Sequence, residues 1–247
     1  MTLNEFFEKH PKAALGFSGG VDSAYLLYEG LRCGADIHPY YIRTAFQPNF
    51  EYADARRLTD QLGVELSVIE LDVLSNPAVA ANPTDRCYHC KAALFGALQA
   101  RAQADGYPLL IDGTNASDDA GDRPGMRALR ELSVLSPLRV CGLTKEEIRR
   151  RSREAGLFTW DKPAYACLAT RIPANMPITF DMLHRVEQAE TVLFALGFRD
   201  FRVRVFHGAA RIQLKDDQIP QAVSAAKQIR ARLAPYFDTV LLDLAGR

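Results

Sequence analysis

The stretch that decides the fold is Ser18-Gly19-Gly20-Val21-Asp22-Ser23, which follows an apolar run at residues 13–17. That short run predicts a buried strand, and the helical spacing of apolar residues over 21–31 predicts a helix after the glycines. At such a junction, backbone N–H groups and the helix dipole favour an anion, and glycines let the main chain approach it closely. We interpret residues 18–23, the phosphate loop, as an anion site; the alternative is an ordinary Gly-rich turn capped by Ser18.

The phosphate loop differs from two widespread nucleotide-binding loops. A Walker A loop needs a Lys before its final Ser or Thr, whereas Asp22 stands before Ser23 here. The Gly-x-Gly-x-x-Gly fingerprint of dinucleotide sites is also missing. A P-loop NTPase and a nicotinamide or flavin site are therefore disfavoured.

Strand-like and helix-like segments alternate on either side of the phosphate loop. The pattern predicts strands at 13–17, 37–42, 65–71 and 109–112, and helices at 21–31, 49–62 and 88–104. Helices between successive strands imply crossover connections, and hence a parallel sheet covered on both faces. We therefore predict a Rossmann-like α/β domain over residues 1–155.

The alternation ends at residues 156–177, where Pro163, Pro173 and Pro177 interrupt any periodicity. Beyond it, the pattern predicts a helix at 180–196, strands at 201–206 and 210–214, a helix at 219–233 and a strand at 239–244. Adjacent strands between helices are typical of α+β domains. We predict a smaller α+β domain at 178–247 for substrate binding or oligomerisation, joined by an active-site linker at 156–177; the length alone also fits one large domain.

Composition narrows the classes of partner. The chain has 247 residues, of which 48% are hydrophobic and 24% charged, as in soluble globular proteins. Thirty basic residues balance thirty acidic ones, so no overall field attracts nucleic acid or an anionic membrane, and we expect neither partner. The first residues lack the pattern of a signal peptide, and no apolar run approaches the roughly 20 residues needed to span a bilayer. We therefore expect a cytoplasmic protein.

A second polar loop, Asp112-Gly113-Thr114-Asn115, follows the fourth predicted strand and precedes Asp118, Asp119 and Asp122. Because ligands collect at the carboxyl ends of parallel strands, we expect this loop to face the phosphate loop across a nucleotide site. Carboxylate oxygens suit Mg²⁺, which makes Asp118 a predicted metal ligand. A solvated turn rich in Asn, Asp and Gly is the alternative.

The five cysteines are an odd number in a chain without an export signal, so reduced thiols are expected. Cys87-Tyr88-His89-Cys90 is a C-x-x-C, which by itself is ambiguous among redox, zinc and iron–sulfur roles. Cys167 lies in the irregular segment near a basic residue, a setting that favours a reactive thiolate. If the three came within reach of one another, they could hold three irons of a [4Fe–4S] cluster and leave the fourth iron open for sulfide. Cys33 and Cys141 are interpreted as inert small hydrophobes.

Several motifs together carry a family resemblance. Ser-Gly-Gly-x-Asp-Ser after an opening strand resembles the loop of the PP-loop ATP pyrophosphatases, whose domains are adenine nucleotide alpha hydrolase-like. Over nearly the whole chain, the sequence is similar to one branch of that class, the LarE sulfur transferases. The matching segments are residues 18–23, 85–91, 112–115, 122–127, 136–138, 167–173 and 177–179.

The resemblance implies an enzyme that binds ATP and Mg²⁺ and adenylates a carboxylate of pyridinium-3,5-biscarboxylic acid mononucleotide, which becomes a thiocarboxylate during nickel-pincer nucleotide synthesis. Family members with three cysteines are implied to use a [4Fe–4S] cluster, here on Cys87, Cys90 and Cys167. Members with one cysteine give up the sulfur of the residue at the position of Cys167. The cluster route is our preferred hypothesis. The alternatives are the sacrificial route, another PP-loop enzyme such as a tRNA thiolase or an amide synthetase, and a nucleotide- or metal-binding module without chemistry.

The resemblance also suggests individual roles. Ser18, Gly19, Gly20, Asp22, Ser23, Gly113 and Thr114 are expected to bind ATP. The resemblance also places Asp22 near Mg²⁺ and pyrophosphate, as a metal ligand with Asp118; a plain acidic residue in the first turn of a helix is the alternative. On one strand, Arg202 and Arg204 would point together towards the substrate phosphate, with Glu190 in the same site and Arg171 beside Cys167; solvent-facing positions are the alternative. Arg43 and Thr44 follow the second strand and are placed near the adenine by position. The family further implies a homo-oligomer, a hexamer.

Overall fold

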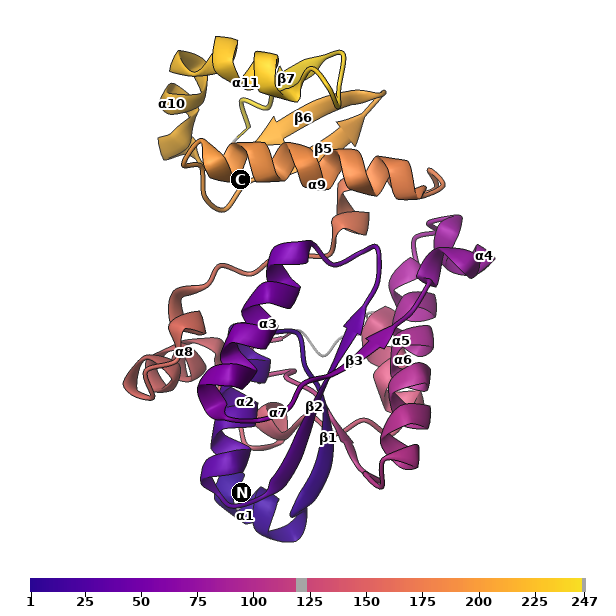
Figure 1. Cartoon of the computed structure of the whole chain (residues 1–247), viewed down its shortest axis with the longest axis vertical. Coiled ribbons are helices and arrows are strands. Elements are labelled where there is room, and N and C mark those ends of the chain that lie inside the picture. The colour runs from indigo at the N-terminus through magenta and orange to yellow at the C-terminus, as the bar shows by residue number, and fades with distance from the viewer. Residues whose placement is uncertain (119–123, 246–247) are drawn as a thin grey trace. The chain divides into compact units, whose positions relative to one another are not determined.

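The computed structural model describes residues 1–118 and 124–245. The chain forms two compact units (Figure 1), a first unit of Met1–Val73 and Asp85–Ala164 and a second unit of Leu74–Thr84 and Tyr165–Arg247. Nothing in the sequence pattern indicated that residues 74–84 would pack with the C-terminal part. The domain boundaries given above, 1–155, 156–177 and 178–247, stay a prediction.

The described part of the first unit contains a parallel sheet of four strands, β1 (Lys12–Gly16), β2 (Asp36–Arg43), β3 (Ser67–Glu70) and β4 (Leu110–Ile111). Its strand order is β3-β2-β1-β4, and each neighbouring pair is parallel. Leu15 of β1 is in register with Pro39 of β2 and Ile111 of β4. This arrangement confirms the predicted α/β fold and brings the carboxyl ends of β1, β2 and β4 to one edge.

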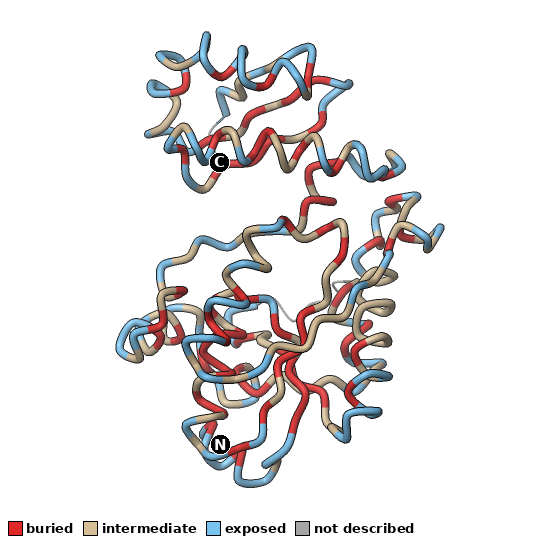
Figure 2. Tube along the Cα trace, viewed as in Figure 1, coloured by how far each residue is buried: buried red, intermediate tan, exposed pale blue. Residues whose placement is uncertain are grey.

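Helices cover both faces of this sheet (Figure 1). Helices α2 (Val21–Arg32), α3 (Asn49–Leu62) and α5 (Arg86–Ala104) pack on the strands. Helices α1 (Leu3–Lys9), α7 (Pro137–Val140) and α8 (Lys145–Glu154) pack on α2, and α6 (Pro124–Glu131) packs on α5. Neighbouring strand residues face opposite ways, so Leu15 joins the core that contains α2, whereas Ala14 joins the core that contains Leu98 of α5. Buried residues accordingly follow the strands in Figure 2.

The second unit has the predicted α+β character. Helix α9 (Phe180–Ala195) is followed by β5 (Arg202–Phe206) and β6 (Ala209–Gln213), which are antiparallel, and β6 pairs in parallel with β7 (Val240–Leu242). The single helix predicted at 219–233 is wrong, because it divides at Ala225 into α10 (Ile219–Ser224) and α11 (Ala226–Leu233). No Gly or Pro stands at the break, so the sequence carries no local signal for it.

The sequence pattern missed several short helices. Helix α8 is capped by the Thr144 side chain, which accepts the N–H of Glu147, and Thr-x-x-Glu is a recognisable start signal. Helix α4 (Pro77–Ala80) is capped by Asn76. The expected irregular segment at 156–177 contains the 3₁₀ turns η2 (Phe158–Asp161) and η3 (Leu168–Arg171). None of the helices in the described ranges combines the length and apolar composition of a bilayer-spanning segment.

Gly30 is required by the packing of α2 on the sheet. A Cβ at this position would lie 2.7 Å from Ile37 Cγ1, on a β-branched side chain with little freedom to move. We expect Gly30→Ala to lower the free energy of unfolding by about 1–3 kcal/mol, measured by urea denaturation. The matched control is Gly96→Ala in α5, where no atom lies within 4 Å of the added Cβ and a gain of about 0.5–1 kcal/mol is expected. Equal effects at both positions would contradict this packing.

Candidate functional site

The phosphate loop leaves the end of β1 and enters α2. Gly19 has a φ of +68°, in the left-handed region, and Gly20 is the N-cap of α2. The two serines brace the turn: the hydroxyls of Ser18 and Ser23 lie 3.2 Å apart, and Ser23 also donates to the Gly20 carbonyl. The turn is therefore held from within by its own side chains.

This geometry suits an anion. The N-cap residue is a glycine, so no N-cap side chain covers the end of α2, where the N–H groups and the dipole of a 12-residue helix converge. Gly19 also has to be small, since an added Cβ would lie 3.0 Å from the backbone of Ala55 in α3. The structure thus gives the predicted loop the form of an anion-binding site.

The loop that follows β4 packs directly on the start of α2. A Cβ on Gly113 would lie 2.9 Å from the backbone nitrogen of Ser23. Asp112 is buried, and its carboxylate accepts the Thr114 hydroxyl at 2.6 Å and the Ser136 hydroxyl at 2.7 Å. Asp112 and Thr114 therefore shape this loop, and Gly113 allows it to reach the phosphate loop.

Asp22 connects the two loops and a third segment. Its carboxylate lies 2.5 Å from Nζ of Lys145, the first residue of α8, and 3.4 Å from the side-chain amide of Asn115, which is buried. Burial raises the pKa of Asp22, and the hydrogen bond and charge of Lys145 oppose that rise. The negative charge of Asp118 contributes to the same rise in pKa, so two carboxylates repel each other at this edge of the sheet.

This acidic pair is the part of the predicted Mg²⁺ site that can be located. The Asp118 carboxylate accepts the Asn115 N–H at 2.9 Å. Asp119 and Asp122 lie outside the described residues. Across 1–118 and 124–245, no group of three or more His, Cys, Asp and Glu side chains has the arrangement of a metal site. Mg²⁺ binding by Asp22 and Asp118 therefore stays a prediction.

A second lysine approaches the phosphate loop from residues 156–164. Nζ of Lys162 lies 2.7 Å from the Asp54 carboxylate of α3 and donates to the Gly19 carbonyl at 3.4 Å. Neither Lys145 nor Lys162 was predicted from the sequence to be a site residue. Their positions depend on contacts between residues that are more than 120 positions apart in the sequence, and no local sequence pattern reveals such contacts.

A narrow pocket opens beside the phosphate loop at the carboxyl ends of β1 and β2. Its volume is about 140 Å³, and it is lined by Gly16, Phe17, Ser18, Tyr40, Tyr41, Ile42, Gln47, Glu51, Leu94 and Phe95. Thr44 lies just beyond β2, and its hydroxyl donates to the lining residue Gln47 at 2.6 Å. Arg43 instead pairs with Glu70 at 3.3 Å and lies over the Tyr52 ring. The pocket has the aromatic and apolar lining that suits a flat base.

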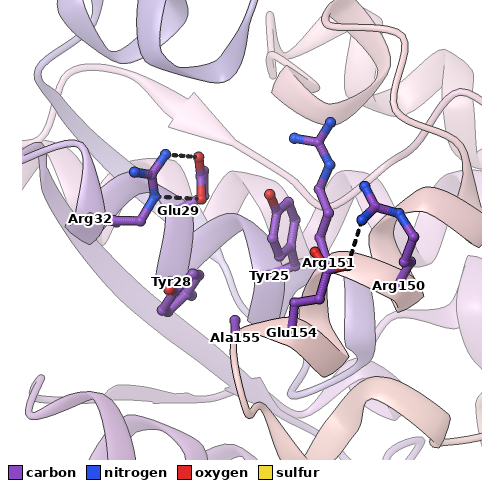
Figure 3. A pocket seen from close by; sticks show the side chains of 8 residues that line it. All are labelled: Tyr25, Tyr28, Glu29, Arg32, Arg150, Arg151, Glu154 and Ala155. Carbon is purple, nitrogen blue, oxygen red and sulfur yellow. Dashed lines mark hydrogen bonds and ion pairs between the residues drawn. The ribbon is translucent and has the colours of Figure 1, made fainter.

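A larger hollow of about 330 Å³ lies between the C-terminal half of α2 and α8 (Figure 3). Its arginines already pair with carboxylates of the same unit: Arg32 with Glu29 at 2.6 Å, and Arg150 with Glu154 at 2.5 Å. The hollow therefore carries little uncompensated charge, and it lies at the other end of α2 from the phosphate loop. We assign it no part in the site.

Two of the predicted sulfur-handling cysteines share one helix. Cys87 and Cys90 lie in the first turns of α5, at positions i and i+3 on one face. Cys87 is exposed and Cys90 partly buried, and the guanidinium of Arg86 lies 3.6 Å from Cys87 Sγ. None of the five cysteines, all within the described ranges, forms a disulfide. Burial raises the pKa values of the Cys33 and Cys141 thiols, which fits unreactive side chains.

Cys167 belongs to the second unit and precedes the 3₁₀ turn η3. Its carbonyl accepts both the backbone N–H and the hydroxyl of Thr170, at 3.0 and 2.8 Å. Nη1 of Arg171 donates to the carbonyl of Ala166 at 2.8 Å. The backbone on either side of the thiol is therefore fixed.

The anchor for this turn is a buried ion pair between Arg171 and Glu190. The two residues are 1% and 2% exposed, and Nε of Arg171 lies 2.8 Å from the Glu190 carboxylate. Glu190 also accepts the Tyr165 hydroxyl and the Val203 N–H. Burial opposes the charge of Arg171, but Glu190 outweighs it and the pKa is raised; burial and the Glu190 charge raise the pKa of Tyr165. Arg171 and Glu190 thus position the Cys167 turn, and their contact with substrate stays a prediction.

Arg202 and Arg204 of β5 both reach the segment that contains Cys167. Arg202 is buried and lies over the Tyr165 ring, 5.1 Å from its centroid. Arg204 donates to the Thr170 carbonyl and to Gln213. Their shared direction matches their spacing on a strand. Whether either binds a phosphate stays a prediction.

Comparisons with known proteins identify the family. No family model matches the chain. An uncharacterised protein of Synechocystis is 38% identical over 253 residues, covering 99% of this chain and 92% of the relative. Pyridinium-3,5-bisthiocarboxylic acid mononucleotide synthase of Lactiplantibacillus plantarum, a LarE protein, is 29% identical over 238 residues, 95% of this chain and 86% of the relative.

The chain belongs to the LarE family. As a LarE-family protein, it is a PP-loop, ATP-dependent sulfurtransferase. The tRNA-specific 2-thiouridylase MnmA of Thermotoga maritima is 25% identical over 196 residues, 61% of this chain and 54% of the relative. That shorter match supports the PP-loop class, while the LarE match extends over almost the whole chain.

Gly113 tests the contact between the two loops of this LarE-family chain. Gly113→Ala would push the loop away from Ser23, so we expect ATP affinity to fall about tenfold or more, measured by calorimetric titration. Gly96→Ala serves as the control because its added Cβ meets no neighbour. Unchanged ATP affinity in Gly113→Ala would argue against a nucleotide at this contact.

The buried pair of the second unit gives a stability test. Glu190→Gln leaves the Arg171 charge buried without its counter-charge, so we expect a loss of about 3–5 kcal/mol in unfolding free energy. The control, Asp181→Asn, removes a carboxylate that pairs with Arg185 on the same helix but is 74% exposed, and a much smaller loss is expected. Urea denaturation compares the two, and equal losses would contradict an anchoring role for Glu190.

Proposed function

We propose that this LarE-family enzyme adenylates a carboxylate of pyridinium-3,5-biscarboxylic acid mononucleotide and converts it to a thiocarboxylate, in nickel-pincer nucleotide synthesis for lactate racemase maturation. The substrate class comes from the Lactiplantibacillus relative, whose name describes a pyridinium bisthiocarboxylic acid mononucleotide synthase. The observation that carries the proposal is the phosphate loop, a glycine-capped helix start with Lys145 and Lys162 beside it. That arrangement suits a reaction in which pyrophosphate is the leaving group.

Adenylation is assigned to the first unit. A carboxylate oxygen of the substrate attacks the α-phosphorus of ATP, and the bond from that phosphorus to the bridging oxygen breaks as pyrophosphate leaves. The N–H groups of residues 18–23 would stabilise the charge that develops on pyrophosphate. Asp22 and Asp118 would hold Mg²⁺, and the pocket lined by Tyr40, Tyr41 and Phe95 would take the adenine.

Sulfur delivery is assigned to Cys87, Cys90 and Cys167. Two of the required thiolates share a face of α5, which fits the donor set of an iron–sulfur cluster, and Cys167 would be the third ligand. A [4Fe–4S] cluster held by these residues would supply a sulfide as the nucleophile. That sulfur would add to the acyl carbon of the adenylate, and AMP would leave with the electron pair of the broken acyl–oxygen bond.

The alternative source is Cys167 itself. In that route its thiolate would displace AMP to form a thioester, and loss of the Cys167 Cα proton with cleavage of the Cβ–Sγ bond would leave dehydroalanine and the thiocarboxylate. The fixed backbone around Cys167 is compatible with both routes. The C-x-x-C pair on α5 favours the cluster, because the sacrificial route has no use for it.

The remaining assignments concern substrate and partners. Arg202 and Arg204 would bind the phosphate of the pyridinium mononucleotide, and Arg171 and Glu190 would hold the Cys167 turn against it. Arg43 and Thr44 would border the adenine side. We further propose a cytoplasmic homo-oligomer, a hexamer, without a nucleic-acid or membrane partner. The balance of thirty basic and thirty acidic residues supports the absence of an RNA substrate.

The proposal is tested by pyrophosphate release from ATP under anaerobic conditions, with and without the pyridinium mononucleotide. We expect release to depend on that substrate, and Cys87→Ala to keep adenylation while it loses iron, acid-labile sulfide and thiocarboxylate formation. Cys33→Ala is the matched control and should retain all four. Loss of one sulfur from Cys167 in the protein mass after turnover would replace the cluster route with the sacrificial one. Release without any pyridinium substrate would contradict the proposed substrate.

A further inference from the structure

The phosphate loop lacks the lysine that a Walker A loop carries, so positive charge for the nucleotide phosphates has to come from elsewhere in the chain. Lys162 supplies such a charge at the loop itself. Its Nζ contacts the Gly19 carbonyl, and Gly19 is the loop residue with the left-handed backbone. A phosphate bound by the neighbouring N–H groups would therefore lie close to this ammonium group.

In the structure, the main partner of Lys162 is Asp54. The two charged groups are 2.7 Å apart, and their side chains are 15% and 29% exposed. A pair at this depth is only partly screened by water, so each charge responds to a new charge nearby. Asp54 carries one negative charge, whereas the β- and γ-phosphates of ATP carry several and present more acceptor oxygens.

Hydrogen bonds fix the backbone around Lys162, whereas its side chain can rotate between Asp54 and a phosphate. Arg149 of α8 donates to the carbonyls of Trp160 and Lys162 at 2.6 and 2.7 Å. Arg149 lies four residues after Lys145, on the same face of α8. One helix thus fixes the chain at Lys162 and places Lys145 on Asp22. An exchange of partners by Lys162 requires side-chain rotation alone.

We propose that Lys162 is a phosphate-binding residue. Its ammonium group breaks the ion pair with Asp54 and binds the β- and γ-phosphates of ATP, and then the departing pyrophosphate. Asp54 competes with the nucleotide for the same ammonium group and so sets the affinity of the site. The inference rests on the proposed use of the phosphate loop for ATP and adds a residue to it.

Substitutions of Lys162 and of Asp54 should change the affinity for phosphates in opposite directions. Lys162→Met should weaken binding of MgATP and of pyrophosphate about tenfold or more, through loss of charge-assisted hydrogen bonds. Asp54→Asn should tighten both, because it removes the competing anion. In the double variant, the effect of Asp54→Asn should disappear, since no ammonium group is left to release. AMP, which lacks the β- and γ-phosphates, should bind all four proteins equally.

The experiment is calorimetric titration of the full-length chain with MgATP, pyrophosphate and AMP in turn, without the pyridinium substrate, so that no turnover occurs. Lys12→Met is the control: Lys12 also pairs with an aspartate, Asp36 at 3.8 Å, but it lies at the start of β1, whereas the phosphate loop follows its end. It should leave all affinities unchanged.

Three results would overturn the inference. They are equal weakening by Lys162→Met and Asp54→Asn, as for a purely structural pair; an equal loss of AMP binding in Lys162→Met; and unchanged pyrophosphate binding in that variant. If the wild-type chain bound neither MgATP nor pyrophosphate, the proposed role of the phosphate loop would fail, and the inference with it. Asp54→Asn is expected to bind more tightly, and the double variant is expected to lose that gain. Poor folding does not produce tighter binding, so a folding defect in Lys162→Met alone does not decide the outcome.

Discussion

The carboxylate of Asp22 is the contact on which the first unit's site depends. It lies at the start of α2, and it binds Asn115 from the loop after β4 and Lys145 from the start of α8. Three segments far apart in the sequence are therefore held at one edge of the sheet by one side chain. Burial raises the pKa of Asp22, and the hydrogen bonds from Lys145 and Asn115, together with the charge of Lys145, oppose that rise.

The negative charge of Asp22 also restricts how the phosphate loop can bind a phosphate. A carboxylate where a Walker A loop has a lysine repels phosphate unless a cation lies between them. Lys145 is that cation in the structure, and a divalent metal is the one proposed for the complex with ATP. The chemistry of the loop is thus set by charges brought from other parts of the chain, and the loop itself contributes shape and N–H groups.

Much of this was predictable from the sequence, and the reasons differ by element. Residues 12–16 and 21–32 are strand and helix because an apolar run ends at two glycines, a local signal that also located the phosphate loop. Tyr165, Lys145 and Lys162 could not be found in this way, because their roles come from contacts across the fold. Glu190 was placed in the substrate site by resemblance, which stays a prediction; its buried ion pair with Arg171 could not be read from the sequence, because the two residues meet only in the fold. The break at Ala225 and the short helices α4 and α7 had no clear periodic signal, whereas α6 buries residues at i, i+3 and i+4, a spacing that sequence reasoning overlooked.

The anchoring of residues 74–84 bears on how the chain folds as it is synthesised. Asn82 is buried, and its side-chain amide donates to the carbonyls of Pro173 and Met176. These carbonyls leave the ribosome long after Asn82 does, since translation proceeds from the N-terminus at roughly 5–20 residues per second. During that interval, α4 and its cap have no docking surface, although β1, β2 and β3, which are made before it, can already pair. The second unit is consequently the last part of the nascent chain to become complete. The Asn82 side chain has no hydrogen-bond acceptors at Pro173 and Met176 until that later segment has been synthesised.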